Sequence, residues 1–195
     1  LGMTNTIALS KDMPAAPNKC APHTLVNGVV EKIPFCVIDN LAPAGSISSS
    51  VSDMSHWVMM QLNNGKYNDT QVVPASAIAQ TWLPHSILGN GRYLYNKGHF
   101  ALYGLGWFLE EYSGRKMVSH TGGVNGFVTS VTLVPEEKLG IIVFTNTDAN
   151  AFYEALKWEI ADAYLGNPYR NYSKAYLGFN DARSKNEQRE EKKFK

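Results

Sequence analysis

The sequence has few cysteines, no strong excess of charge and no long apolar run. Its 195 residues carry 18 Lys and Arg against 17 Asp and Glu, which gives a formal net charge of +1. This balance gives no reason to expect nucleic acid or an anionic membrane as a partner. No apolar run approaches the roughly 20 residues that span a bilayer, so we expect no transmembrane segment in this chain.

Only two cysteines are present, Cys20 and Cys36, and they form no C-x-x-C pair. Two cysteines and scattered histidines make a poor zinc site, so we predict no metal and no other cofactor. Sequence spacing alone does not establish a disulfide. We therefore predict two free, partly buried thiols, keep a single disulfide as the alternative, and leave the compartment open.

The first residues lack the features of a targeting signal. Residues 1–6 have neither the basic region nor the apolar region of a signal peptide. Residues 1–6 also lack a residue that would cap the start of a helix or strand. We therefore expect them to be the end of an element that begins upstream. The composition, 44% hydrophobic and 18% charged residues, is typical of a globular domain, and the length suffices for one ordinary core.

The first half of the chain predicts a hairpin and two helices. Asn27-Gly28 suits a type I′ turn, because both residues tolerate positive φ, and the apolar residues on either side suggest a short hairpin. A helix is expected over about 50–64, because Ser50 and Asp53 resemble a capping box and an Asn-Gly pair supplies the stop. A second helix is expected to begin at Pro74.

The stretch from 102 to 146 has β-branched and aromatic residues separated by turn residues, a pattern typical of strands. Strands are expected at 107–109, 116–118, 127–134 and 140–145. Three or four strands joined by short turns predict an antiparallel meander. The last strand is almost continuously apolar and should be buried on both faces, and a helix over about 150–165 should cover the sheet.

The most informative segment for chemistry is Ser119-His120-Thr121-Gly122-Gly123. Glycines let a backbone lie close to a ligand, and a backbone N–H here can stabilise charge that develops on a carbonyl oxygen. His120 can donate a proton or orient a substrate near neutral pH. The alternative is structural, because strand glycines often mark a bulge and a lone histidine usually belongs to the packing.

Six stretches resemble, in order along the chain, motifs of the serine β-lactamase and penicillin-binding-protein family, in the branch of class C β-lactamases and D-alanyl-D-alanine carboxypeptidases. They are 1–6 (PLGM-x-x-T), 42–49 (PAGG, a hydrophobic residue, x-S), 103–107 (YGLGW), 120–123 (the K-T-G or H-T-G third motif), 140–146 (G, an apolar run, T-N) and 162–166, the end of the last helix. Each is weak alone, but six in the family's order make the resemblance specific, and it covers roughly residues 1 to 175.

The resemblance implies an α+β, β-lactamase/transpeptidase-like fold in which helices flank an antiparallel sheet, and it makes this chain the C-terminal portion of that fold. It also implies a serine hydrolase that acts on an amide or ester through an acyl-enzyme. Within the third motif, His120 would bias the proton network, Thr121 and Gly122 would bind the substrate, and the N–H of Gly123 would be the second oxyanion-hole donor.

His120 stands where the family has Lys or His. A free His, with a pKa of about 6.5, is mostly neutral at neutral pH, whereas a free Lys is charged. The constant positive charge for a penicillin-like carboxylate is therefore missing. The missing charge favours esterase or peptidase activity over β-lactam hydrolysis.

The family's nucleophile has no counterpart at the expected place. The S-x-x-K match at Ser113 and Lys116 lies in a predicted hairpin turn, and the Y-x-N match at Tyr169 and Asn171 lies in a polar tail, so we treat both as chance. We expect the true motifs in an upstream segment of the same protein, which leaves this fragment inactive alone. The alternatives are a non-catalytic binding or scaffolding domain of the same fold and a small unrelated α+β binding domain.

Two parts of the chain differ in composition. Residues 1–175 are expected to form the C-terminal portion of the hydrolase domain, and residues 176–195 a charged tail or a linker to a further domain. The expected substrate is a small molecule or a peptide. The resemblance alone suggests a periplasmic or secreted protein.

Overall fold

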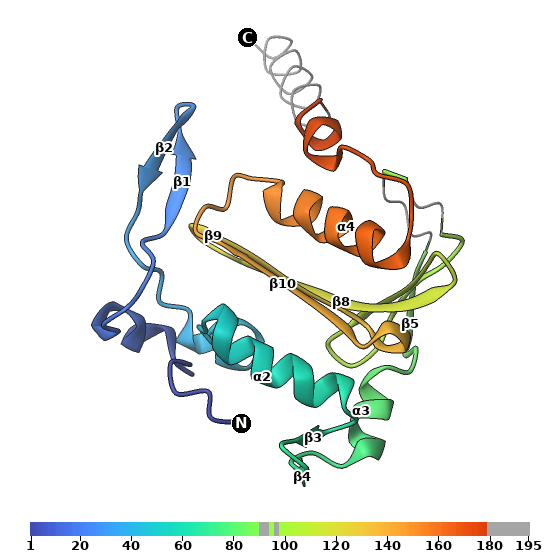
Figure 1. Cartoon of the computed structure of the whole chain (residues 1–195). Helices are drawn as coiled ribbons and strands as arrows, with labels where there is room; N and C mark the ends of the chain where they lie inside the picture. Colours follow the sequence, from blue (N-terminus) through green and yellow to red (C-terminus); the bar gives the residue numbers. More distant parts are fainter. Residues whose placement is uncertain (90–93, 96–97, 179–195) are drawn as a thin grey trace.

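A six-stranded antiparallel sheet forms the centre of the protein, with helices on both of its faces (Figure 1). This computed structural model describes residues 1–89, 94–95 and 98–178. The strands are β5 (Ser86–Gly89), β6 (Ala101–Tyr103), β7 (Phe108–Tyr112), β8 (Arg115–Val124), β9 (Phe127–Val134) and β10 (Leu139–Thr145). Their order in the sheet follows the sequence, so the sheet is a meander.

The predicted meander and its antiparallel pairing are confirmed. β9 and β10 pair with Ile142 opposite Val131, as the short connection through η3 (Pro135–Glu137) requires. The sequence predicted three or four strands, and the structure adds β5 and β6 at one side. β5 escapes prediction because its four residues, which are all exposed, show no alternation of apolar and polar positions.

The remaining elements precede the sheet or cover it. They are η1 (Ser10–Ala15), β1 (His23–Val26), β2 (Val29–Lys32), η2 (Asp39–Leu41), α1 (Ala42–Gly45), α2 (Val51–Leu62), β3 (Lys66–Tyr67), β4 (Thr70–Gln71), α3 (Ala75–Thr81) and α4 (Phe152–Leu165). Asn27 and Gly28 have φ of 51° and 82°, as a type I′ hairpin turn requires. The predicted hairpin and the predicted helices are therefore present. None of the helices within the described ranges has the length and apolarity that a membrane span needs.

Ser50 caps α2, and Asp53 anchors the first residues of the chain to this helix. The Ser50 hydroxyl accepts a hydrogen bond from the Asp53 N–H at 3.1 Å. The Asp53 carboxylate accepts hydrogen bonds from the Asn5 N–H and the Thr6 hydroxyl, both at 2.8 Å. In a capping box this carboxylate would instead accept from the backbone N–H of Ser50. Burial raises the pKa of this carboxyl, but the hydrogen bonds from Thr6 and Asn5 outweigh burial and hold the pKa below its ordinary value.

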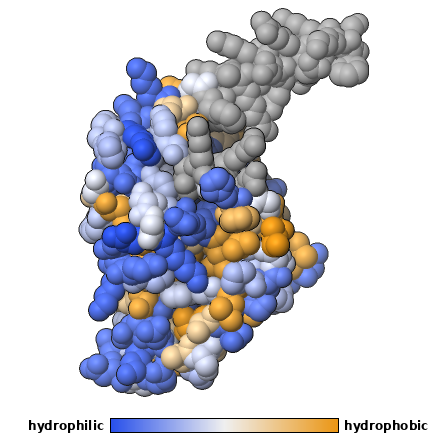
Figure 2. Space-filling model, turned by 90° about the vertical axis from the view of Figure 1, so that its right-hand side faces the viewer, coloured by the Kyte–Doolittle hydropathy of each residue, from blue (hydrophilic) through white to orange (hydrophobic). Residues whose placement is uncertain are grey.

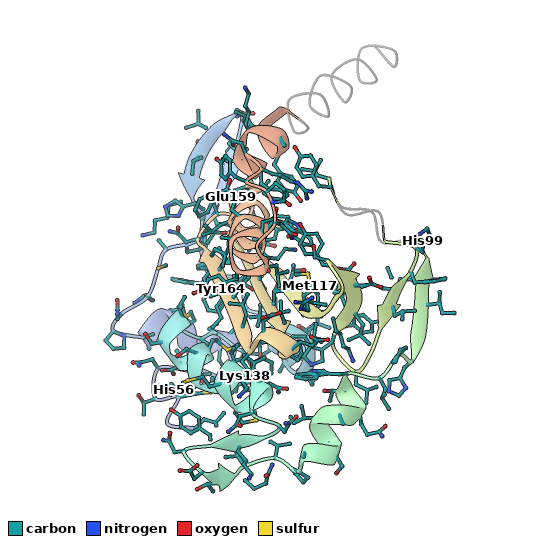
Figure 3. The ribbon with its side chains drawn as sticks, turned by 45° about the vertical axis from the view of Figure 1, so that its right-hand side comes forward. His56, His99, Met117, Lys138, Glu159 and Tyr164 are labelled. Carbon is teal, nitrogen blue, oxygen red and sulfur yellow. The ribbon has the colours of Figure 1, made fainter. Side chains whose placement is uncertain are left out.

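α4 covers one face of the sheet with buried apolar side chains. Trp158 and Ala161 of α4 are 1% and 0% exposed. The cluster contains Tyr112, Met117, Val134, Leu139, Ile141, Val143, Ala155, Trp158, Ala161 and Tyr172. Figure 3 shows Met117 between α4 and the sheet. The prediction that this helix covers the sheet is confirmed.

α2 covers the opposite face (Figure 1). Its cluster contains Val58, Trp107, Leu109, Val118 and Leu133. Gly140 lets α2 lie close to β10, because a Cβ there would be 2.2 Å from Cγ1 of Val58. Ile141 and Val143 are buried under α4, whereas Ile142 is only partly buried. The prediction that this strand is buried on both faces therefore holds for the α4 face and only in part for the α2 face.

Both edges of the sheet carry exposed features. In the described part of the chain β10 pairs only with β9, so the other side of this apolar strand presents unpaired backbone N–H and C=O groups. At the opposite edge, Ile87 and Leu88 of β5 are 80% and 52% exposed, and Phe100 is 71% exposed. Figure 2 shows apolar side chains gathered on this face of the molecule.

The segment after α4 packs back into the core. Tyr172 is 2% exposed, and its hydroxyl donates to Asp162 at 2.8 Å. The hydroxyl of Tyr112 also donates to Asp162, and burial together with this bond raises the pKa of Tyr112. The expectation of a polar tail directly after the last helix is therefore wrong at Tyr172. Residues 172–178 are helical, and the charged stretch 183–195 lies outside the described residues.

The two cysteines lie before and after the β1–β2 hairpin. Both thiols are free, as predicted. Cys36 is partly buried, whereas Cys20 ends a run of exposed residues, 17–20. The prediction of partial burial is therefore wrong for Cys20.

The free energy of unfolding should depend on the buried cluster of Tyr112, Asp162 and Tyr172. Tyr172→Ala should lower the free energy of unfolding by about 3–5 kcal/mol, as removal of a buried aromatic ring does. Tyr172→Phe keeps the ring and should cost about 1.5–3 kcal/mol through the lost hydrogen bond to the Asp162 carboxylate. The control is Tyr169→Ala, at a residue 78% exposed, which should change the value by less than about 0.5 kcal/mol. Urea unfolding measures all three, and an unchanged midpoint for Tyr172→Ala would contradict the packing described.

The chain of 195 residues should self-associate when expressed alone. The open β10 edge offers a strand for pairing, and the β5 face adds apolar surface. Ile87→Lys should weaken association through β5 and leave association through β10. Light scattering and calorimetry measure the outcome, and a monodisperse monomer with a cooperative thermal transition would show that the chain is a self-sufficient domain.

Candidate functional site

The second half of β8 has a partner strand on one side only. β7 pairs with β8 from Arg115 as far as Ser119, which lies opposite Phe108. On its other side β8 pairs with β9 up to Val124, opposite Phe127. No other strand in the described ranges pairs with residues 120–124. This segment therefore presents a short backbone edge that an extended chain can pair with.

The residues predicted for the site lie on this segment and are exposed. His120, Thr121, Gly122 and Gly123 are each exposed to solvent. His120 is therefore not buried in the core, and its role in the site stays a prediction. That the four residues line a cleft stays a prediction; one hollow on the described surface lies elsewhere, with Phe100, Leu109 and Lys116 in its lining.

His120 has ordered neighbours although it is exposed. Its Nε2 lies 3.0 Å from the Tyr103 hydroxyl, and its Nδ1 lies 2.6 Å from the Thr121 carbonyl oxygen. The ring centroids of His120 and Phe108 are 5.4 Å apart. The contact with Tyr103 was not predicted from the sequence, although Tyr103 begins the YGLGW stretch.

The two glycines have different surroundings. A Cβ at Gly122 would lie 2.5 Å from Oγ1 of Thr129, so the neighbouring strand β9 already requires a small residue there. A Cβ at Gly123 would meet no atom within 4 Å. The backbone of Gly123 is thus open to the approach of another molecule, whereas Gly122 also serves the packing of the sheet.

The β1–β2 hairpin is attached beside the end of β8. The Gly126 N–H in the β8–β9 turn donates to Asp148 at 2.9 Å, and the Gly126 carbonyl accepts from the His23 N–H at 3.3 Å. Hydrogen bonds from the Thr24 side chain and the Gly126 N–H hold the pKa of the Asp148 carboxyl below its ordinary value. The His23–Gly126 and Thr24–Asp148 contacts join residues more than a hundred positions apart, and no local pattern predicts them.

Ser113 is not placed to act as a nucleophile with Lys116. It lies in the β7–β8 turn with φ of 50°, and its hydroxyl is 2.8 Å from Nδ2 of Asn167. The Lys116 ammonium instead donates to the Trp82 carbonyl at 2.7 Å. The two side chains are engaged with different partners, as expected for a chance match in a turn.

The Y-x-N match is likewise structural. Tyr169 is 78% exposed, and the Asn171 side chain accepts from the Lys174 N–H at 2.8 Å. This contact caps the helical residues 172–178 in the way an N-cap does.

Solved structures show the fold. The octameric penicillin-binding protein homologue from Pyrococcus abyssi matches with a TM-score of 0.64 and 20% identity, over 85% of this chain and 35% of its own. A D-stereospecific amidohydrolase from Streptomyces sp. matches with a TM-score of 0.57 and 15% identity, over 75% of this chain and 40% of its own. The predicted β-lactamase/transpeptidase-like fold is therefore confirmed.

Two curated relatives are hydrolases. Unguisins hydrolase ungD′ of Aspergillus campestris is 24% identical over 170 residues, which is 85% of this chain and 30% of the relative. Unguisins hydrolase ungD of Aspergillus violaceofuscus is 26% identical over 184 residues, which is 86% of this chain and 32% of the relative. The chain thus spans about a third of the length of these relatives.

A family model described as Beta-lactamase matches residues 4–165. The match runs from the segment bound to Asp53 to the end of α4 and includes all of β8. Together with the fold, this match confirms the resemblance noted in the sequence. The chain belongs to the Beta-lactamase family, a family of serine hydrolases.

Proposed function

We propose that this chain supplies one wall of the active site of a serine hydrolase that cleaves an amide or ester through an acyl-enzyme. The observation that carries the proposal is the half-paired strand β8, whose exposed residues His120 to Gly123 match the family's third motif. An open backbone edge with two glycines gives an extended substrate both hydrogen-bonding groups and room.

In this proposal the N–H of Gly123 is one donor of the oxyanion hole. A fixed backbone dipole stabilises the charge that develops on the carbonyl oxygen as the tetrahedral intermediate forms. The open edge of β8 supports this role, because no strand in the described ranges pairs with residues 120–124 on the side away from β9. Thr121 and Gly122 bind the substrate beside it, and His120 orients its polar end.

The absence of a permanent charge on a histidine side chain favours peptide or ester substrates. A lysine at position 120 would offer a constant cation to a penicillin-like carboxylate, whereas an imidazole offers no constant cation. The name of one similar structure, a D-stereospecific amidohydrolase, agrees with amide cleavage, and the unguisins hydrolases agree with hydrolysis in general.

The nucleophile is proposed to come from an upstream segment of the same protein that carries S-x-x-K and Y-x-N. Two observations support this part. The Ser113–Lys116 pair is held apart by Asn167 and Trp82, and the relatives are about three times as long as the segment matched here. The same upstream segment is proposed to complete the sheet at the open edge of β10.

A covalent serine probe tests the proposal. This chain alone should form no adduct with a fluorophosphonate, whereas the protein expressed from its complete gene should form one adduct, on a serine upstream. Ser113→Ala in the complete protein is the matched control and should leave labelling unchanged. A stoichiometric adduct on Ser113 would contradict our assignment of this residue, and a complete protein without S-x-x-K and without an adduct would favour the non-catalytic binding domain.

Changing the charge at position 120 should change substrate preference. In the complete protein, His120→Lys should raise the rate of acylation by penicillin relative to an uncharged ester by roughly tenfold, since a hydrogen bond to a charged group contributes about 1.5–3 kcal/mol. His120→Gln, which adds no charge, is the control and should give no such rise. Stopped-flow acylation measures the ratio, and an equal response of both variants would show that position 120 does not face the substrate.

A further inference from the structure

Two aromatic side chains from neighbouring strands hold the imidazole of His120. Tyr103 ends β6 and Phe108 begins β7. The Tyr103 ring meets the Phe108 ring edge-on, with centroids 5.0 Å apart, and the Phe108 ring lies 5.4 Å from the imidazole. The hydroxyl of Tyr103 reaches Nε2 of His120 at 3.0 Å. An exposed side chain thus has a defined set of contacts.

The contacts of the two ring nitrogens fit one neutral tautomer. Nδ1 lies 2.6 Å from the Thr121 carbonyl oxygen, which can only accept, so Nδ1 carries the hydrogen in this bond. In the neutral ring Nε2 then has a lone pair, and the Tyr103 hydroxyl is its donor. Each nitrogen is therefore matched with the partner that this tautomer requires.

The end of β6 holds the hydroxyl of Tyr103 in place. The Tyr103 carbonyl accepts from the His85 N–H, and the Gly104 N–H donates to the Trp107 carbonyl, both at 2.8 Å. A Cβ at Gly104 would lie 2.2 Å from the Thr81 carbonyl oxygen, so α3 packs directly on this turn. A functional group on a supported strand end keeps its position better than one on a free loop.

We infer that Tyr103 is a positioning residue that fixes the orientation and the tautomer of His120. The inference rests on the proposed function, in which His120 faces the substrate.

Nitrogen NMR of the protein expressed from its complete gene, labelled with ¹⁵N-histidine, tests the tautomer directly. At a pH where the histidines are neutral, His120 should show a protonated Nδ1 and an unprotonated Nε2. Tyr103→Phe should move both signals toward the tautomer mixture of a free imidazole. His120→Gln assigns the signals, and Tyr67→Phe is the control, because Tyr67 contacts His56 through its ring and lies away from β8.

Two results would overturn the inference. One is a wild-type His120 protonated at Nε2. The other is a Tyr103→Phe variant with unchanged His120 signals. Unchanged signals of the four other histidines in these 195 residues show in the same spectrum that the variant is folded. This measurement does not depend on turnover, so a failure of the proposed function is distinguished from a failure of the inference.

Kinetics of the complete protein supply the second readout. Tyr103→Phe should lower kcat by about tenfold with little change in KM, because substrate contacts remain while the histidine is mispositioned. In the His120→Gln background the same change should have less than about a twofold effect, since Tyr103 then has no imidazole to hold. Equal effects in both backgrounds would show that Tyr103 acts independently of His120.

Discussion

The unequal pairing of β8 is the constraint on which the candidate site depends. β8 is ten residues long; β7 pairs with its first five residues and β9 with residues 118–124, so Val118 and Ser119 lie between two strands and the last five residues have β9 alone. The change occurs because β7 begins at Phe108, directly after the tight turn at Gly104 to Trp107 that closes β6 on β7. That turn exposes the backbone of residues 120–124 and brings Tyr103 to His120.

The helices make this edge rigid from both sides of the sheet. α4 and α2 bury opposite faces of the same strands, so Met117 and Val118, adjacent in β8, belong to different apolar clusters. A strand held in this way has little freedom to shift its register, since a shift of one residue would exchange the two faces. The exposed half of β8 therefore projects from a fixed base.

Local patterns in the sequence predicted local structure well. The Asn27-Gly28 turn and the Ser50 cap depend on interactions within a few residues, and both are present. Residues 120–123 were identified as the third motif because the other family motifs precede and follow them in the expected order along the chain.

The errors concern contacts between distant residues. Asp53 binds Thr6, 47 positions away, and Tyr172 reaches Asp162 from a stretch that looks polar. The Tyr103–His120 contact depends on how β6, β7 and β8 pair with one another, and no periodicity in the sequence encodes that pairing. Composition likewise gave no information on Cys20, whose exposure depends on which segments pack over it.

The central claim is that the open edge of β8 is where the substrate backbone lies. A crystal structure of the protein expressed from its complete gene, with a peptidyl boronate on the serine proposed upstream, tests this most directly. The account predicts an inhibitor chain antiparallel to residues 120–124, with a boronate oxygen within hydrogen-bonding distance of the Gly123 N–H. An inhibitor bound elsewhere, with this edge of β8 covered by another part of the protein, would contradict it.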